Sequence, residues 1–230
     1  MKRLLAATAG VALLAGCAGL PPVEQPGGAP ATQPEQACGS AAADVELHLK
    51  LVQQMHDKGL FHAALAHLDA LSERDRALPE ARYLRAESLR RMGKGAEAET
   101  IYQGLLGGCL QGLAYRGLGL LAAQAGRIDA AVDHLQAARE FLPTDPRVRN
   151  DLGYALLLQG AVEEARTQFM TALELDGDRR RVIANMVLLL FVADDEAGAR
   201  RLAGEAGIDA MELMSIRDQA QELRKKGPGS

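Results

Sequence analysis

The sequence predicts an all-α protein, built as a solenoid of about five helix pairs with one further helix at its C-terminus. Three observations support this prediction. Glycine followed five residues later by alanine recurs every 33 or 34 residues, helical periodicity begins at residue 44, and almost no segment alternates as a strand would. A period of this length is typical of solenoids, in which each repeat packs only on its neighbours.

The repeat is expected to run from residue 45 to residue 213. Its glycine–alanine pairs are Gly59 with Ala64, Gly93 with Ala98, Gly126 with Ala131, and Gly160 with Ala165. A further step of 34 reaches Asp194, with Ala199 at the same offset. A glycine between two helices indicates a turn in the left-handed backbone region. The expected units are residues 45–78, 79–111, 112–145, 146–179 and 180–213.

The third and fourth units resemble the tetratricopeptide repeat (TPR) family. In the fourth unit, "PRVRNDLGYALLLQGAVEEARTQFMTALELDGDR", Leu152 and Gly153 match the leucine–glycine pair of the first helix. Ala165, Phe169 and Ala172 match the small, aromatic and small positions of the second helix. The resemblance implies a right-handed superhelix of helix pairs. Because two helices cross closely only where side chains are small, we expect Gly153 to meet Ala165.

The fifth unit departs from this pattern. Val187 replaces the small residue at the helix crossing, and Asp194 replaces the turn glycine. Whether this unit folds as a standard pair therefore stays open. Residues 209–226 are predicted to form a capping helix, because Asp209 is a plausible N-cap and basic residues cluster at the far end. The tail at 227–230 is expected to be disordered.

The N-terminus has the features of a secretory signal at residues 1–16. Lys2 and Arg3 precede an apolar stretch that is too short to span a bilayer core, which needs roughly 20 residues. The stretch ends in "LAGC", which resembles the bacterial lipobox. This resemblance implies that the mature chain begins at Cys17, which carries the lipid; an ordinary signal peptide is the alternative. Because Ala18 is not aspartate, the resemblance further implies that the protein is located at the periplasmic face of the outer membrane.

Residues 17–43 are predicted to form the lipidated anchor and a tether for a TPR domain at 44–226. They are rich in Pro, Gly, Gln and Ala and lack apolar periodicity, which is typical of a disordered or extended linker. The whole chain has 26 Lys+Arg and 30 Asp+Glu. Without Lys2 and Arg3 the balance is 24 against 30, so the mature chain is acidic and has no electrostatic reason to bind nucleic acid.

The sequence shows no motif for catalysis or for a cofactor. The stretch "GLGLLA" at 117–122 matches a dinucleotide-binding fingerprint, but it lies inside a repeat helix and does not follow a strand. The five histidines lack the spacing of a zinc site. We therefore expect a binding scaffold that is not an enzyme, with no catalytic residues, no metal, no small-molecule substrate and no cofactor besides the lipid on Cys17.

Two cysteines, Cys38 and Cys109, follow the predicted anchor. An oxidising periplasm would permit a disulfide between them. Both positions fall on the same edge of a helix-pair solenoid, two repeats apart, a distance of roughly 20 Å that about six extended residues can span. The bond would fold the tether back along the stack. Two unpaired thiols are the alternative.

The TPR resemblance also implies a concave groove lined by the first helix of each unit. The groove positions of the first two units are mostly polar, and those of the later units become apolar. The predicted partner-binding residues are Arg116, Leu120, Asn150, Tyr154, Leu157, Leu158, Ala184, Leu188 and Phe191. Two candidates remain for the segment that covers this apolar part of the groove. One is the helix at 209–226, and the other is an amphipathic helix or extended segment of another protein.

The whole plan resembles bacterial assembly lipoproteins, most of all the TadD family of tight-adherence (Flp) pilus systems. The shared features are the lipoprotein signal, the Pro-rich tether, "NDLGYALLLQG" at 150–160 and "VIANMVLLL" in the last repeat. The resemblance implies a pilotin-like role, in which a secretin subunit or another pilus-assembly protein is the partner. The alternatives are type IV pilus pilotins, outer-membrane protein assembly lipoproteins, and adaptors that regulate peptidoglycan enzymes or proteases.

Overall fold

A computed structural model divides the chain into two units, Met1–Pro34 and Glu35–Ser230. It describes residue 38 and residues 41–175 and 178–227. The predicted signal peptide, Cys17, most of the tether and the last three residues therefore lie outside the described residues. Among the helices that are described, none is long and apolar enough to cross a membrane.

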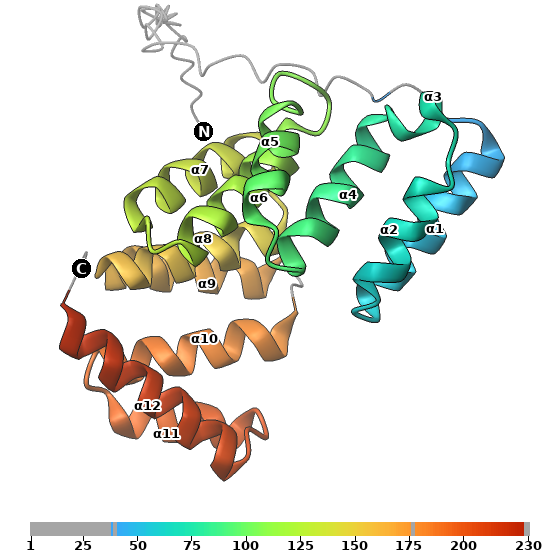
Figure 1. Ribbon diagram of the computed structural model, residues 1–230. Coiled ribbons are helices and arrows are strands. Elements are labelled where there is room, and N and C mark those ends of the chain that lie inside the picture. Colours follow the sequence, from blue (N-terminus) through green and yellow to red (C-terminus); the bar gives the residue numbers. More distant parts are fainter. Residues whose placement is uncertain (1–37, 39–40, 176–177, 228–230) are drawn as a thin grey trace, which may run out of the picture. The chain divides into compact units, whose positions relative to one another are not determined.

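The described residues form twelve helices and no strand, which confirms the all-α prediction (Figure 1). The helices are α1 (Ala43–Asp57), α2 (Phe61–Asp69), α3 (Glu73–Arg76), α4 (Pro79–Arg91), α5 (Gly95–Gln103), α6 (Gln111–Gln124), α7 (Ile128–Phe141), α8 (Pro146–Gln159), α9 (Val162–Glu174), α10 (Arg179–Val192), α11 (Glu196–Glu205) and α12 (Ala210–Lys226).

Ten of these helices form five pairs that stack in chain order. The pairs are α1 with α2, α4 with α5, α6 with α7, α8 with α9, and α10 with α11. The short helix α3 connects the first pair to the second. The fifth unit, whose geometry the sequence left open, forms a helix pair like the others.

The close crossing within each pair depends on a fully buried alanine in its second helix. Ala64, Ala98, Ala131, Ala165 and Ala199 occupy equivalent positions, and the exposed fraction of each is 0%. A larger side chain at this position would push the first helix away. The alanines that recur every 33 or 34 residues in the sequence therefore mark five equivalent helix crossings.

Next to the alanine of the fourth pair, the first helix contributes a small residue and the second helix a large one. A Cβ atom added to Gly153 would lie 2.7 Å from the Phe169 ring and 3.2 Å from the carbonyl oxygen of Ala165. In the fifth pair the sizes are reversed, because Val187 takes the place of the glycine and Ala203 takes the place of the phenylalanine. Both residues are buried. The apparent departure at Val187 therefore conserves the volume of the crossing.

The turn inside each pair requires a left-handed residue. The four turn glycines identified in the sequence have φ between 71° and 90°, and at the fifth turn Asp194 has φ of 60°. Aspartate is one of the few other residues that tolerate this region. The Asp194 carboxylate also accepts a charged hydrogen bond from Arg224 of α12. The residue that breaks the glycine pattern therefore helps to hold the last helix.

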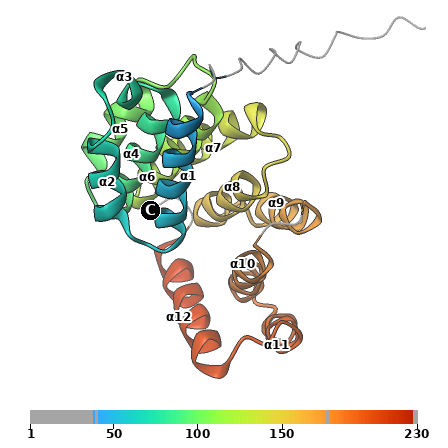
Figure 2. The ribbon, with the colours of Figure 1, turned by 90° about the vertical axis from the view of Figure 1, so that its right-hand side faces the viewer.

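Helix α12 does not continue the stack. Asp209 caps its N-terminus, accepting hydrogen bonds from the backbone N–H groups of Met211 and Glu212 at 2.9 Å each. A sixth repeat would pack its first helix on α11, whereas α12 makes its main contacts with α10 (Figure 2). Ile216 and Ala220 of α12 are buried in the same apolar cluster as the core of α8 to α11.

Gly153→Ala is expected to destabilise the protein by about 1–3 kcal/mol, because the new methyl group would collide with Phe169 in a closely packed crossing. Thermal and denaturant unfolding would measure the change. The matched control is Gly204→Ala in α11, where an added Cβ meets nothing within 4 Å. That variant should gain up to about 1 kcal/mol from helix propensity. Equal effects of the two substitutions would show that Gly153 does not lie at a close crossing.

Candidate functional site

The first helices of the five pairs, α1, α4, α6, α8 and α10, line one side of the stack. Two of the hollows described below are lined mainly by these helices. A third lies at the turns after α6 and α8, against the end of α12. The groove has two unlike parts. Its C-terminal part, over α8 and α10, is covered by α12, whereas no described helix covers its N-terminal part, over α1, α4 and the start of α6.

Helix α12 buries several residues that the sequence assigned to a partner. Leu157, Leu188 and Phe191 are only 2%, 2% and 4% exposed, and they share an apolar cluster with Ile216 and Ala220. These three residues are therefore covered by the chain itself in this structure, and their contact with another protein stays a prediction. Of the two occupants considered for this part of the groove, the structure contains the protein's own C-terminal helix.

The other predicted apolar contacts, Leu120, Tyr154, Leu158 and Ala184, remain partly exposed. Tyr154 lies beside α12, and its hydroxyl oxygen accepts a hydrogen bond from Nε2 of Gln219 at 2.9 Å. Burial raises the pKa of Tyr154, although the bond to Gln219 opposes this. Leu158 lines one hollow, and Leu120 and Tyr154 line another; both hollows lie between α12 and the helices α6 and α8.

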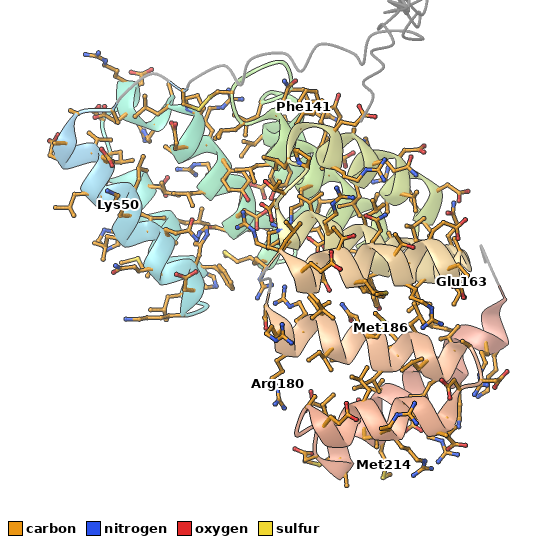
Figure 3. The ribbon with its side chains drawn as sticks, turned by 180° about the vertical axis from the view of Figure 1, so that it is seen from behind. Lys50, Phe141, Glu163, Arg180, Met186 and Met214 are labelled. Carbon is orange, nitrogen blue, oxygen red and sulfur yellow. A yellow bond between two sulfur atoms is a disulfide. The ribbon has the colours of Figure 1, made fainter. Side chains whose placement is uncertain are left out.

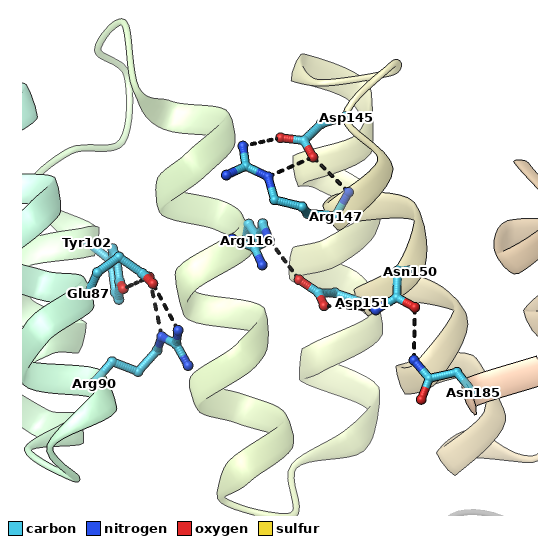
Figure 4. Close-up of polar contacts among 9 residues, drawn as sticks. All are labelled: Glu87, Arg90, Tyr102, Arg116, Asp145, Arg147, Asn150, Asp151 and Asn185. Atoms are coloured by element: carbon cyan, nitrogen blue, oxygen red, sulfur yellow. Dashed lines mark hydrogen bonds and ion pairs between the residues drawn. The ribbon is translucent and has the colours of Figure 1, made fainter. Parts of the chain in front are cut away.

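A chain of polar side chains crosses the middle of the groove (Figure 4). Nε of Arg116 donates to Oδ2 of Asp151 at 2.6 Å, and the two side chains are only 11% and 9% exposed. Nδ2 of Asn185 donates to Oδ1 of Asn150 at 2.8 Å. Arg116 and Asn150 were predicted to guide a partner. Instead they connect neighbouring repeats, because each finds its polar partner on the next first helix.

A second buried cluster lies on the second helix pair (Figure 4). Arg90 donates to the Glu87 carboxylate at 2.9 Å, and the hydroxyl group of Tyr102 donates to the same carboxylate. Burial alone would raise the pKa of Glu87, but Arg90 and Tyr102 hold it below its usual value. The Glu–Arg spacing of three on one helix signals the pair in the sequence. The hydrogen bond from Tyr102 was not predicted, because Tyr102 lies on the second helix of the pair, outside the spacing rule for a single helix.

His56 of α1 joins the first pair to the second. Its Nε2 lies 2.7 Å from the hydroxyl oxygen of Ser88, and that hydroxyl donates to the carbonyl oxygen of Leu84 at 3.0 Å. The Ser88 oxygen must therefore accept from Nε2–H of His56. Burial lowers the pKa of His56, an effect that Glu87 and Asp57 oppose.

The open N-terminal part of the groove contains a hollow of about 480 Å³. We call it the N-terminal groove. Its lining includes Leu49 and Lys50 of α1, Glu80 and Leu84 of α4, and Leu113 of α6. Clefts of roughly 300–1,000 Å³ are the usual size of small-molecule and cofactor sites in proteins. The repeat positions of Leu49 and Glu80 place them in the groove, yet the partner-binding residues predicted from the sequence all lie further along the chain.

A disulfide joins Cys38 to Cys109, with Cα atoms 5.3 Å apart. Of the two states left open by the sequence, the structure contains the bond. It connects the segment before α1 to the loop before α6, and Cys38 lines the N-terminal groove. A carboxylate oxygen of Glu80 and both sulfur atoms lie within 4.8 Å of one another. Because both sulfur atoms are in the bond, they do not act as thiolate ligands, and we assign no metal here.

Comparison with known proteins agrees with this architecture. Family models described as tetratricopeptide repeats match residues 57–109 and 122–202. The TPR repeat-containing protein PA4299 of Pseudomonas aeruginosa is 36% identical over 221 residues, which cover 96% of this chain and 85% of that protein. The chain belongs to the tetratricopeptide repeat proteins.

Two solved structures show the same fold. TTC0263, a thermophilic TPR protein of Thermus thermophilus, has a TM-score of 0.64 at 18% identity, and the match covers 78% of this chain and 98% of that one. PilF of Pseudomonas aeruginosa has a TM-score of 0.60 at 19% identity, covering 81% and 93%. At these identities the likeness shows the TPR superhelix alone. TPR proteins are generally non-enzymatic scaffolds suited to protein–protein interaction.

Asp151→Asn is expected to destabilise this TPR protein by about 3–5 kcal/mol, because it leaves the buried guanidinium of Arg116 without its counter-charge. Replacing both partners, with Arg116→Met and Asp151→Leu together, should cost far less. Denaturant unfolding of the single and double variants would measure both changes. The control is Arg200→Ala, which removes an exposed pair with Glu196 and should cost less than about 1 kcal/mol. If the double variant lost as much unfolding free energy as the two single substitutions lose in sum, Arg116 and Asp151 would not be a coupled buried pair.

Acidification is expected to weaken the contact between the first two pairs. Because the pKa of folded His56 lies below its unfolded value of about 6.5, the folded state binds fewer protons. Stability is then lost as the pH falls from about 7 through the folded pKa. His56→Gln keeps a donor for Ser88 and removes the titrating group, so its unfolding free energy should depend less on pH. Identical pH profiles for wild type and variant would argue against this role of His56.

Proposed function

We propose that this protein is a lipoprotein of the outer membrane, held at the periplasmic face by lipid on Cys17, with a pilotin-like role in the assembly of a Flp pilus secretin. One observation carries the proposal. A lipobox-like "LAGC" and a Pro-rich linker precede a TPR domain in a single chain. This order of segments suits a scaffold that holds a partner protein near a membrane.

The open groove gives the proposal a binding surface. The N-terminal groove lies on a stack of repeats in which each pair supports the next, so its lining residues are held in place by the core. Cys38 forms part of this lining. A tether that ends at Cys38 would therefore deliver the groove, and any partner in it, at a limited distance from the lipid anchor.

Deletion of the gene is expected to abolish detergent-resistant secretin multimers in outer-membrane fractions. Wild-type protein should restore them, whereas Cys17→Ser should not, because an unlipidated chain lacks the anchor. Gly204→Ala serves as a control that should restore them fully. Secretin multimers that persist in the deletion strain would contradict the pilotin-like role. If cell-wall hydrolysis changed instead, the adaptor function would be favoured.

A further inference from the structure

We propose that the N-terminal groove binds an extended segment of a partner protein that places one lysine or arginine beside Glu80, between apolar side chains. The inference rests on the proposed function in one respect, that the scaffold binds a protein. It adds where the partner lies and which chemistry it presents. The binding site moves from repeats three to five, where the sequence predicted it, to repeats one to three.

The first observation is an uncompensated negative charge. Oε2 of Glu80 is buried and has no hydrogen-bond partner among the described residues, and no described cation forms an ion pair with this carboxylate. Lys50, the cation in the lining of the groove, pairs instead with Glu46 at 2.8 Å. Glu80 as a whole is half-buried, so a cation from outside would meet the carboxylate at its other oxygen, Oε1, and not at the buried Oε2. A carboxylate that is partly removed from water normally has a partner, because desolvating a charge is costly.

The start of α4 offers Glu80 only partial compensation. Glu80 lies in the first turn of this helix, where the helix dipole favours a negative charge by about 0.3–1 kcal/mol. A lysine or arginine from a partner would complete the interaction, and such pairs become stronger when the partner excludes water. The groove therefore favours a cationic segment over an acidic one.

The second observation is the apolar part of the lining that Glu80 shares. Leu49 and Leu84 are buried beneath the groove, and Leu110 and Leu113 are partly exposed beside it. These leucines can receive apolar side chains that flank the cation. Alternate side chains of an extended segment project to opposite sides, so a cation and its neighbours can contact different parts of the lining.

The covered part of the groove limits how much partner can bind. Helix α12 already lies over α10, so a partner helix cannot run the full length of the stack. A short extended segment fits the hollow of about 480 Å³ without displacing α12. The Cys38–Cys109 bond ties the start of α1 to the start of α6 across the open part. It keeps this surface preformed, which lowers the ordering cost of binding.

The test is selection of random peptides of about twelve residues, displayed on phage, against the immobilised full-length protein in detergent. Wild type is compared with Glu80→Gln, which removes the charge and keeps the shape, and with Leu113→Glu. The control is Glu163→Gln on α9, whose side chain is 80% exposed and lies far from Lys50 and α1 (Figure 3). A thermal melt of each variant confirms that it is folded.

Wild type and the control should both select peptides with one lysine or arginine between apolar residues. Glu80→Gln should weaken the best peptide by at least about tenfold, measured by fluorescence anisotropy. Changing the peptide's cation to glutamine should cost wild type the same factor and cost Glu80→Gln nothing. Selection of acidic peptides, selection of none, or equal binding by a folded Glu80→Gln variant would overturn the proposal.

The secretin experiment separates this inference from the proposed function. If deletion abolishes secretin multimers while Glu80→Gln binds the peptides as wild type does, the role stands and the docking site is wrong. If peptide binding depends on Glu80 while secretin multimers survive deletion, the docking site stands and the pilotin-like role is wrong.

Discussion

The rest of the structure depends on one constraint, the close crossing of two helices over a buried alanine. Five such crossings recur, each with an alanine of 0% exposure. Because each helix pair leaves an apolar face, each must be covered by the next pair. The constraint acts on volume, not on residue identity, since Val187 with Ala203 replaces the glycine and phenylalanine of the preceding pair.

The same constraint leaves an apolar surface at the end of the stack. Helix α12 packs there on the groove side only. A solenoid needs its last apolar surface covered. Here α12 covers the groove side of α10, where Leu188 and Phe191 are buried, and Arg224 reaches back to the turn at Asp194. The same helix therefore caps the stack and occupies part of the groove, and the docking surface that we propose around Glu80 lies at the opposite end.

The sequence predicted the repeats well because their requirements are local. A left-handed turn needs glycine or a tolerant substitute such as Asp194, and a close crossing needs alanine. The groove was harder to predict, because burial of Leu188 depends on where a separate helix folds. Arg116 with Asp151, and Asn150 with Asn185, pair at a separation of 35 residues. That separation is one period plus one residue, so a search for polar partners one repeat away would have indicated these contacts.

Hydrogen exchange of the intact protein tests the central claim, that α12 closes the C-terminal part of the groove and leaves the N-terminal part open. A helix of 17 residues is marginal in water unless it packs on the rest of the protein. The account predicts that backbone amides in the middle of α12 exchange as slowly as those of α10. Rapid exchange throughout α12, with α10 still protected, would show that the last helix leaves the groove uncovered.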